Sequence, residues 1–172
     1  MLMFKRILLR LRDMKTIATL ISEADKQANL SGEEEPGVEH FVLSAIELPD
    51  GSAKRVLKQI GTDPEEFKEA IKKQYIEALN SAGISHKCIE DDPEPIESKT
   101  LLHNSKPSGQ ALMKALHAFK KEEKDSPLLG MHVLVVAASM KHSVAGRAFK
   151  IMGIDTKILT DAAKDELASI QY

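Results

Sequence analysis

Two ionisable residues, Glu39 and His40, are adjacent at the start of an apolar segment that runs to Leu48. A carboxylate beside an imidazole could perform general acid–base catalysis. Neighbouring positions of a helix, however, point about 100° apart, so these two side chains would not face each other. We therefore predict no catalytic residues here, and we expect the His40 ring to pack inside the protein and hydrogen-bond to nearby backbone.

Other residues that could bind a metal or act as nucleophiles do not form a recognisable site. His86, Cys88, His103 and His117 lack the paired close spacings of a structural zinc site. Cys88 lies in an acidic segment, which disfavours a reactive thiolate, and no serine occupies a GxSxG turn. The sequence therefore predicts no metal, no cofactor and no enzymatic activity.

The sequence carries one pattern twice. His40 aligns with His132 when the chain is shifted by 92 positions, and the match then continues without a gap over 32 residues. The identical pairs are His40/His132, Ala45/Ala137, Ala53/Ala145, Arg55/Arg147, Lys58/Lys150, Gly61/Gly153, Asp63/Asp155 and Ala70/Ala162. His132 should therefore share the structural role of His40. The recurring arginines either stay on a solvated helix face or hold the repeats, or a partner, together.

Each copy contains the signals that end one helix and begin the next. Gly61 and Gly153 follow apolar residues at helical spacing, where a glycine in the left-handed conformation closes a helix. Two residues later, Asp63 and Asp155 can cap a new helix by accepting from its free N–H groups, and Pro64 suits the first helical position. Each copy therefore reads as helix, turn, helix, turn, helix.

A longer amphipathic helix precedes each copy, which makes the unit about four helices, used twice. No segment alternates with period two for long enough to predict a strand. The predicted fold is all-α, with two four-helix repeats in one compact domain. Its parts are a basic amphipathic extension (1–12), the first repeat (13–80), an acidic, proline-containing linker (81–106) and the second repeat (107–172).

The extension, MLMFKRILLRLR, mixes apolar and basic residues. Its basic residues interrupt the apolar ones too often for a signal peptide or a transmembrane span. Apolar residues continue at helical spacing beyond it, at Ile17, Leu20, Ile21, Ala24 and Ala28. We therefore expect a first helix that packs on its own domain, and the alternative is a basic amphipathic helix that lies on a membrane.

Composition narrows the classes of partner. The net charge is -2, with 24 basic and 26 acidic residues, which gives no general reason to expect nucleic-acid binding. The single cysteine cannot form an internal disulfide, which fits a reducing compartment, and we expect a cytoplasmic protein. The acidic run 33–35 is expected to be a solvated loop.

The repeated motifs resemble the Clp N-terminal repeat domain, which precedes the AAA+ rings of bacterial and plastid Clp unfoldases. The segments that carry the resemblance are GVEHFVLSAI and SAKRVLKQIGTD in the first half, and GQALMKALHAF, LGMHVLVVAAS and VAGRAFKIMGID in the second. The resemblance implies two four-helix repeats related by a pseudo-twofold axis, and a role in binding substrates and adaptors. The sequence has no GxxxxGK[ST] phosphate loop. We therefore expect a stand-alone domain, monomeric or weakly dimeric, that acts through a Clp unfoldase, an adaptor or substrate peptides.

The resemblance also suggests where ligands bind. In some relatives the glutamate of a GTEH motif helps to bind phospho-arginine, once per repeat. Here the first motif reads GVEH, with Val38 and Glu39, and the second reads LGMH, with Gly130 and Met131. Because Met131 replaces the acid, a groove for peptides or a partner protein at these four residues is favoured over phospho-arginine binding.

Two other classes of function stay open at the level of sequence. One is a small helical enzyme or metal-binding protein that uses Glu39, His40 and His132. The other is a stress protein that sequesters a small ligand between the repeats. Both are alternatives to an accessory, adaptor or decoy of a Clp system.

Overall fold

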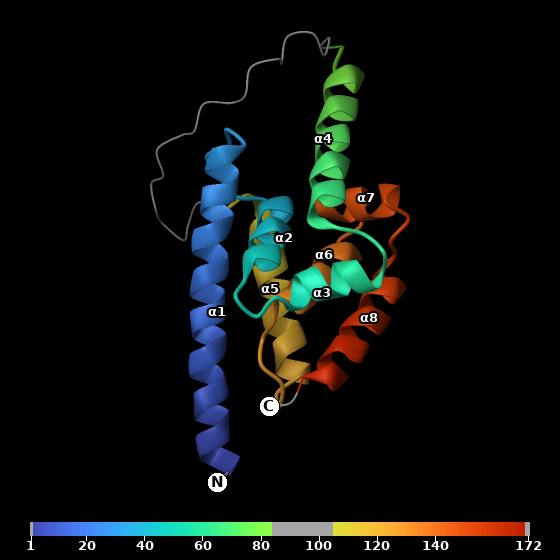
Figure 1. Ribbon diagram of the computed structural model, residues 1–172. Helices are drawn as coiled ribbons and strands as arrows, with labels where there is room; N and C mark the ends of the chain where they lie inside the picture. The colour runs from blue at the N-terminus through green and yellow to red at the C-terminus, as the bar shows by residue number, and fades with distance from the viewer. Residues whose placement is uncertain (1, 84–104, 171–172) are drawn as a thin grey trace.

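The computed structural model describes residues 2–83 and 105–170, and these two stretches contain eight helices and no strand (Figure 1). The first stretch forms α1 (Leu2–Leu30), α2 (Val38–Glu47), α3 (Ser52–Gln59) and α4 (Pro64–Ser81). The second forms α5 (Pro107–Glu122), α6 (Gly130–Ser139), α7 (Val144–Ile151) and α8 (Thr156–Ser169). The all-α prediction is confirmed. The predicted linker 81–106 lies outside the described residues, except for its two ends.

The two groups of four helices follow the repeat seen in the sequence. The first residues of α2, α3 and α4 lie 92 positions before those of α6, α7 and α8. The same shift places the start of α5, Pro107, on Lys15, although α1 begins at Leu2. By the same shift residues 2–12 correspond to residues 94–104, which lie outside the described part of the chain.

The repeats pack against each other through reciprocal contacts. Helix α3 contacts α6 and α8, and α7 contacts α2 and α4 in the same way (Figure 1). Arg55 Nε donates to Glu166 Oε1 at 2.6 Å, and Arg147 Nε donates to Gln74 Oε1 at 2.7 Å. Arg147 lies 92 positions after Arg55, and Gln74 lies 92 positions before Glu166, so the two pairs are equivalent. Such matched contacts are those that a pseudo-twofold axis requires, and they show that the recurring arginines join the repeats.

The buried apolar side chains form a single cluster to which both repeats contribute. Its largest members include Phe41, Phe67 and Phe149, and the rings of Phe67 and Phe149 lie 4.8 Å apart across the repeats. Most of the remaining core is aliphatic, as expected for a chain without tryptophan. Burial of this shared surface is the main stabilising contribution to the fold.

The helix ends have the geometry that the sequence predicts. Gly61 and Gly153 have φ angles of 80° and 74°, a region where residues with a side chain are strained. Asp63 accepts from the N–H groups of Glu65 and Glu66 at the start of α4. Asp155 accepts from the N–H group of Ile158 at the start of α8.

Helix α1 packs on the domain over only part of its length. Leu20, Ala24 and Ala28 are fully buried, which agrees with the predicted packing. Residues 4–14 are different, because their large apolar side chains are exposed; these are Phe4, Ile7, Leu8, Leu11 and Met14. The expectation that the extension packs on its own domain is therefore wrong for this segment. No neighbouring element of the described structure covers these side chains.

Candidate functional site

The start of α2 is held together by His40. Gly37 occupies the N-cap position, and its N–H group donates to His40 Nδ1 at 3.0 Å. The hydroxyl of Ser31 donates to carbonyls at the end of α1, so its oxygen is free to accept from His40 Nε2, 2.9 Å away. These partners require the neutral tautomer with its proton on Nε2. His40 thus satisfies one N–H group of the helix start and ties α2 to the end of α1.

Burial keeps this imidazole neutral. The side chain is 2% exposed, and burial lowers the pKa of His40 to about 4. Glu39 Oε1 lies 3.6 Å from Nδ1, a position that would favour a charged ring. The neutral form nevertheless fits the structure better, because Nδ1 accepts from the backbone and has no proton to share with the carboxylate.

His132 repeats this arrangement at the start of α6. Its Nδ1 accepts from the N–H group of Leu129 at 3.1 Å. Burial, followed by the charge of Lys120, lowers the pKa of His132 to about 4, although Asp50 and Asp13 act in the opposite direction. The ring also packs against Phe119, with centroids 5.2 Å apart. The two histidines therefore make the same helix-capping contact in both repeats.

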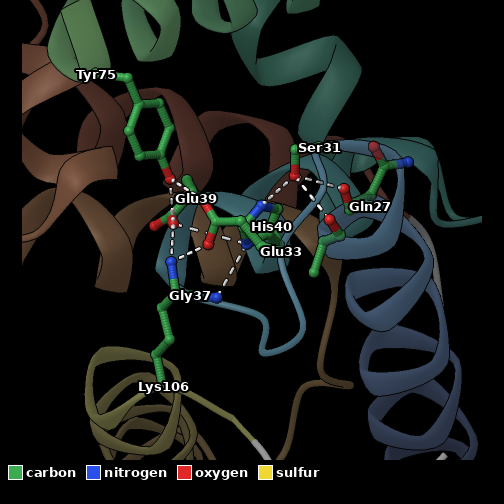
Figure 2. A network of polar contacts seen from close by, with 9 residues as sticks. Gln27, Ser31, Glu33, Gly37, Glu39, His40, Tyr75 and Lys106 are labelled. Atoms are coloured by element: carbon green, nitrogen blue, oxygen red, sulfur yellow. Dashed lines mark hydrogen bonds and ion pairs between the residues drawn. The ribbon is translucent and has the colours of Figure 1, made fainter. Parts of the chain in front are cut away.

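Glu39 is the buried centre of a polar cluster whose other members are partly exposed (Figure 2). Tyr75 Oη donates to Glu39 Oε1 at 3.0 Å and lies 2.7 Å from Glu33 Oε1. The ammonium group of Lys106 is ion-paired with Glu33 and lies 3.9 Å from Glu39 Oε1. These four residues are called the Glu39 cluster below. It joins the loop before α2 to α4 and to the start of the second repeat.

The environment of the cluster favours one charge pattern. Burial raises the pKa of Tyr75 well above its usual value, and the charge of Glu39 and its hydrogen bond act in the same direction. Burial lowers the pKa of Lys106. The phenol therefore stays protonated and acts as a hydrogen-bond donor. Two carboxylates then face one ammonium group and one phenol.

Two residues of the cluster lie close enough to His40 to offer ligands to a metal ion. In the part of the chain that the structure describes, the group with suitable ligand atoms is Glu33, Glu39 and His40, which lie within 4.8 Å of one another; His132 is not part of it. His40 Nδ1, however, already accepts from Gly37, and Lys106 supplies a positive charge beside both carboxylates. A divalent ion would have to displace both contacts. The cluster is therefore better described as an ion-paired network than as a metal centre.

The start of α6 lacks this cluster. Met131 is fully buried, and its N–H group donates to Ser52 Oγ at 3.0 Å. The preceding N–H group, on Gly130, donates to Asp50 Oδ2 at 3.2 Å. A Cβ atom on Gly130 would lie 2.6 Å from the carbonyl oxygen of Ala45, so only glycine lets α6 approach α2 this closely.

Two clefts lie at equivalent places in the two repeats. Cleft A, with a volume of about 360 Å³, is lined by Arg12, Lys15, Thr16, Thr19, Leu48, Pro49, Asp50, Leu128 and Leu129. Cleft B, with a volume of about 540 Å³, is lined by Ser108, Ser139, Met140, Lys141, His142 and Ser143. A shift of 92 positions places residues 48–50 on 140–142, and Thr16 on Ser108. Both clefts therefore lie between the first helix of a repeat and the loop that joins its second and third helices. Cleft A is lined in addition by Leu128 and Leu129, from the loop between α5 and α6.

The residues singled out in the sequence do not line these clefts. Val38, Glu39, Gly130 and Met131 are all buried, so their side chains are not exposed to a partner in this structure. Sequence reasoning missed Tyr75 and Lys106, because nothing in their local pattern connects them to Glu39. It also placed Glu33 in a solvated loop, although this side chain is only 21% exposed and ion-paired. Cys88 and the histidines 86 and 103 lie outside the described residues.

Comparison with known proteins identifies one domain type. The family model for the Clp repeat (R) N-terminal domain matches residues 15–88. A search of curated proteins found no match. None of the helices that the structure describes is long and apolar enough to cross a bilayer.

Proposed function

Residues 15–88 belong to the Clp repeat N-terminal domain family, and from this premise we propose that the chain is a non-catalytic accessory or adaptor of a Clp AAA+ unfoldase. The Clp N-terminal domain is a protein-binding module. In this proposal the chain binds unfolded segments or a Clp component in the cytoplasm. It would bring them together without transforming them chemically.

The observation that carries the proposal is the pair of equivalent clefts. Both contain exposed hydroxyl and basic groups beside apolar side chains, a combination that can hold an extended peptide by its backbone and its side chains. Cleft A presents Arg12 and Lys15 beside one acid, Asp50, whose carboxylate already accepts from two backbone N–H groups, whereas cleft B presents Lys141 and His142. Each is therefore suited to a segment with some acidic character.

Glu39 has a supporting role in this proposal. Its carboxylate already has Tyr75 and Lys106 as partners, and it lies beneath the surface. Binding the guanidinium group of a phospho-arginine would require these contacts to break and a buried carboxylate to find a new partner. We therefore propose that the Glu39 cluster holds the first repeat in shape and that the clefts make the contacts with ligands.

Affinity capture with the purified chain, followed by mass spectrometry, tests the proposal. The expected result is enrichment of a Clp unfoldase, a Clp adaptor or unfolded client proteins. Variants Thr16→Trp and Ser108→Trp fill equivalent positions of clefts A and B and should reduce this enrichment. The control Lys72→Trp places the same side chain on an exposed face of α4, outside both clefts, and should leave capture unchanged.

Two results would contradict the proposal. One is capture that contains neither a Clp component nor unfolded clients. The other is equal capture by the wild type and a variant with both clefts filled, provided that its melting temperature stays close to that of the wild type. Either result would remove the clefts as the binding surface.

A further inference from the structure

The first half of α1 exposes an apolar stripe to solvent. Five large apolar side chains on residues 4–14 are more than half exposed; they are Phe4 (72%), Ile7 (52%), Leu8 (56%), Leu11 (58%) and Met14 (65%). At about 100° per residue, all five fall within an arc of about 120° on the helix. A continuous apolar face of this kind, without a neighbouring element to cover it, indicates an interaction surface.

This segment precedes the part of α1 that aligns with α5. Its equivalent in the second repeat would precede α5, which begins at Pro107, the position that corresponds to Lys15. The match to the family model also begins at residue 15. Figure 1 shows the start of α1 reaching beyond the ends of the other helices. The five stripe residues line neither cleft, although Arg12, on the same segment, lines cleft A.

The basic residues beside the apolar stripe favour a negatively charged partner. Four exposed basic residues lie on the same segment but outside the apolar arc; they are Lys5, Arg6, Arg10 and Arg12. The guanidinium group of Arg6 lies 3.9 Å from the carboxylate of Asp125, and both side chains are exposed. The one acidic residue of the segment, Asp13, is buried, accepts from the N–H group of Leu128 at 2.7 Å and lies 3.4 Å from Lys120 Nζ.

The same charges distinguish between possible occupants of the stripe. Two copies of the segment packed side by side would bring eight basic side chains together, which is unfavourable at moderate salt. An anionic lipid surface instead supplies negative headgroups for the basic side chains and acyl chains for the apolar ones. The arrangement matches a helix that lies in the plane of a membrane interface.

We propose that residues 4–14 dock the protein on an anionic lipid bilayer. The helix lies along the interface with Phe4, Leu8 and Leu11 inserted below the headgroups. Three basic residues that line no cleft, Lys5, Arg6 and Arg10, contact lipid phosphates. The segment is too short and too charged to cross the membrane. Docking in this way would hold clefts A and B near the bilayer surface.

Co-sedimentation of the full chain with vesicles tests this proposal. Vesicles of phosphatidylcholine and phosphatidylglycerol should bind the protein, vesicles of phosphatidylcholine alone should bind it at least about tenfold less, and added salt should weaken the binding. Leu8→Glu should reduce binding to anionic vesicles by about tenfold or more, because one inserted leucine is lost. The matched control is Leu30→Glu, since Leu30 is 63% exposed at the other end of the same helix. This variant should bind as the wild type does.

Three outcomes would overturn the proposal. The first is no binding to anionic vesicles, and the second is equal binding by Leu8→Glu and the wild type. The third is a lipid-free dimer that Leu8→Glu abolishes, without any vesicle binding, which would assign the stripe to a second copy of the chain. Since both leucines are exposed, melting temperatures should stay unchanged in both variants, and loss of binding can then be read as loss of docking.

Discussion

The starts of α2 and α6 have the same backbone plan and different side-chain chemistry. In both, a buried histidine accepts from the N-cap N–H group, at 3.0 Å from His40 and 3.1 Å from His132. One position earlier, Glu39 organises an ion-paired cluster, whereas Met131 is fully buried without one. The histidine therefore belongs to the scaffold of the repeat, and the residue before it is where the two repeats differ.

The difference extends beyond a single residue. At the position equivalent to Tyr75 the second repeat has Leu167, which packs against the core. At the position equivalent to Lys106, the first repeat has Met14. Glu39, Tyr75 and Lys106 thus correspond to apolar residues, whereas Glu33 corresponds to an exposed acid, Asp125. The buried carboxylate and its two partners are therefore absent together from the second repeat, and the acid that remains there is exposed.

The largest expected effect is a pH dependence of stability, caused by the buried histidines that the starts of α2 and α6 share. Between pH 7 and 5 we expect a loss of about 4 kcal/mol in unfolding free energy from the two histidines together. Their pKa values are about 4 in the folded protein and 6.5 when unfolded. The unfolded chain therefore binds more protons in this window, and stability falls as the pH falls from 6.5 towards 4. Urea denaturation over a pH series measures the slope.

Two single variants measure how much each histidine contributes to the pH dependence of the unfolding free energy. His40→Gln and His132→Gln each keep a side-chain acceptor at the third helical position and remove the titration. Each should lower the pH dependence by about half relative to the wild type. A slope that is unchanged in both variants would show that other groups cause the acid sensitivity.

The next largest effect is expected when glutamate, the residue of the first repeat, is introduced at the equivalent position of the second. Met131→Glu should destabilise the protein by about 3 kcal/mol, because it buries a carboxylate without the partners that Glu39 has. The reciprocal Glu39→Met should cost less, since Tyr75 and Lys106 keep Glu33 as a partner. Chemical denaturation of both variants measures the difference. Equal costs would contradict the view that the cluster is specific to the first repeat.

Removal of the cation should have an intermediate effect. Lys106→Met leaves Glu33 and Glu39 facing each other without an ammonium group, and we expect a loss of about 2 kcal/mol. The matched control is Lys54→Met, which breaks the exposed Lys54–Glu47 pair and should cost less than about 1 kcal/mol. Thermal and urea denaturation report both values. A loss for Lys106→Met no larger than for the control would mean that the ion pair adds little.

The smallest effect comes from the phenol. Tyr75→Phe removes the hydrogen bond to Glu39 and keeps most of the ring packing, so we expect a loss of about 1 kcal/mol. In the Glu39→Met background the same change should cost less, and a double-mutant cycle measures the coupling. Additive effects would show that Tyr75 and Glu39 do not act together.

Most of the fold could be predicted from the sequence, because its signals are local. Gly61 and Asp63 mark a helix end and a helix start through backbone geometry and capping, and their equivalents recur 92 positions later. The same repeat predicted the order of helices in both halves. It could not show that α1 extends as an exposed helix beyond the repeat, because an apolar helical pattern does not reveal whether a neighbour covers it.

The candidate site was less predictable, because it depends on contacts between distant segments. Glu39 and His40 were found from the motif, and the repeat separated the recurring histidine from the acid that does not recur. Lys106 falls within the predicted linker and Tyr75 on an ordinary amphipathic helix, so neither carries a local sign of its contact with Glu39. The clefts likewise combine the first helix of each repeat with a loop of that repeat, and cleft A also includes Leu128 and Leu129 of the second repeat.

Binding by clefts A and B is tested most directly with a permanently unfolded, fluorescently labelled polypeptide, whose binding to the purified chain is followed by anisotropy. We expect saturable binding that weakens in Thr16→Trp and in Ser108→Trp, weakens further when both are combined, and persists in Lys72→Trp. Binding of equal strength in the combined variant and the wild type, with both folded, would contradict this expectation.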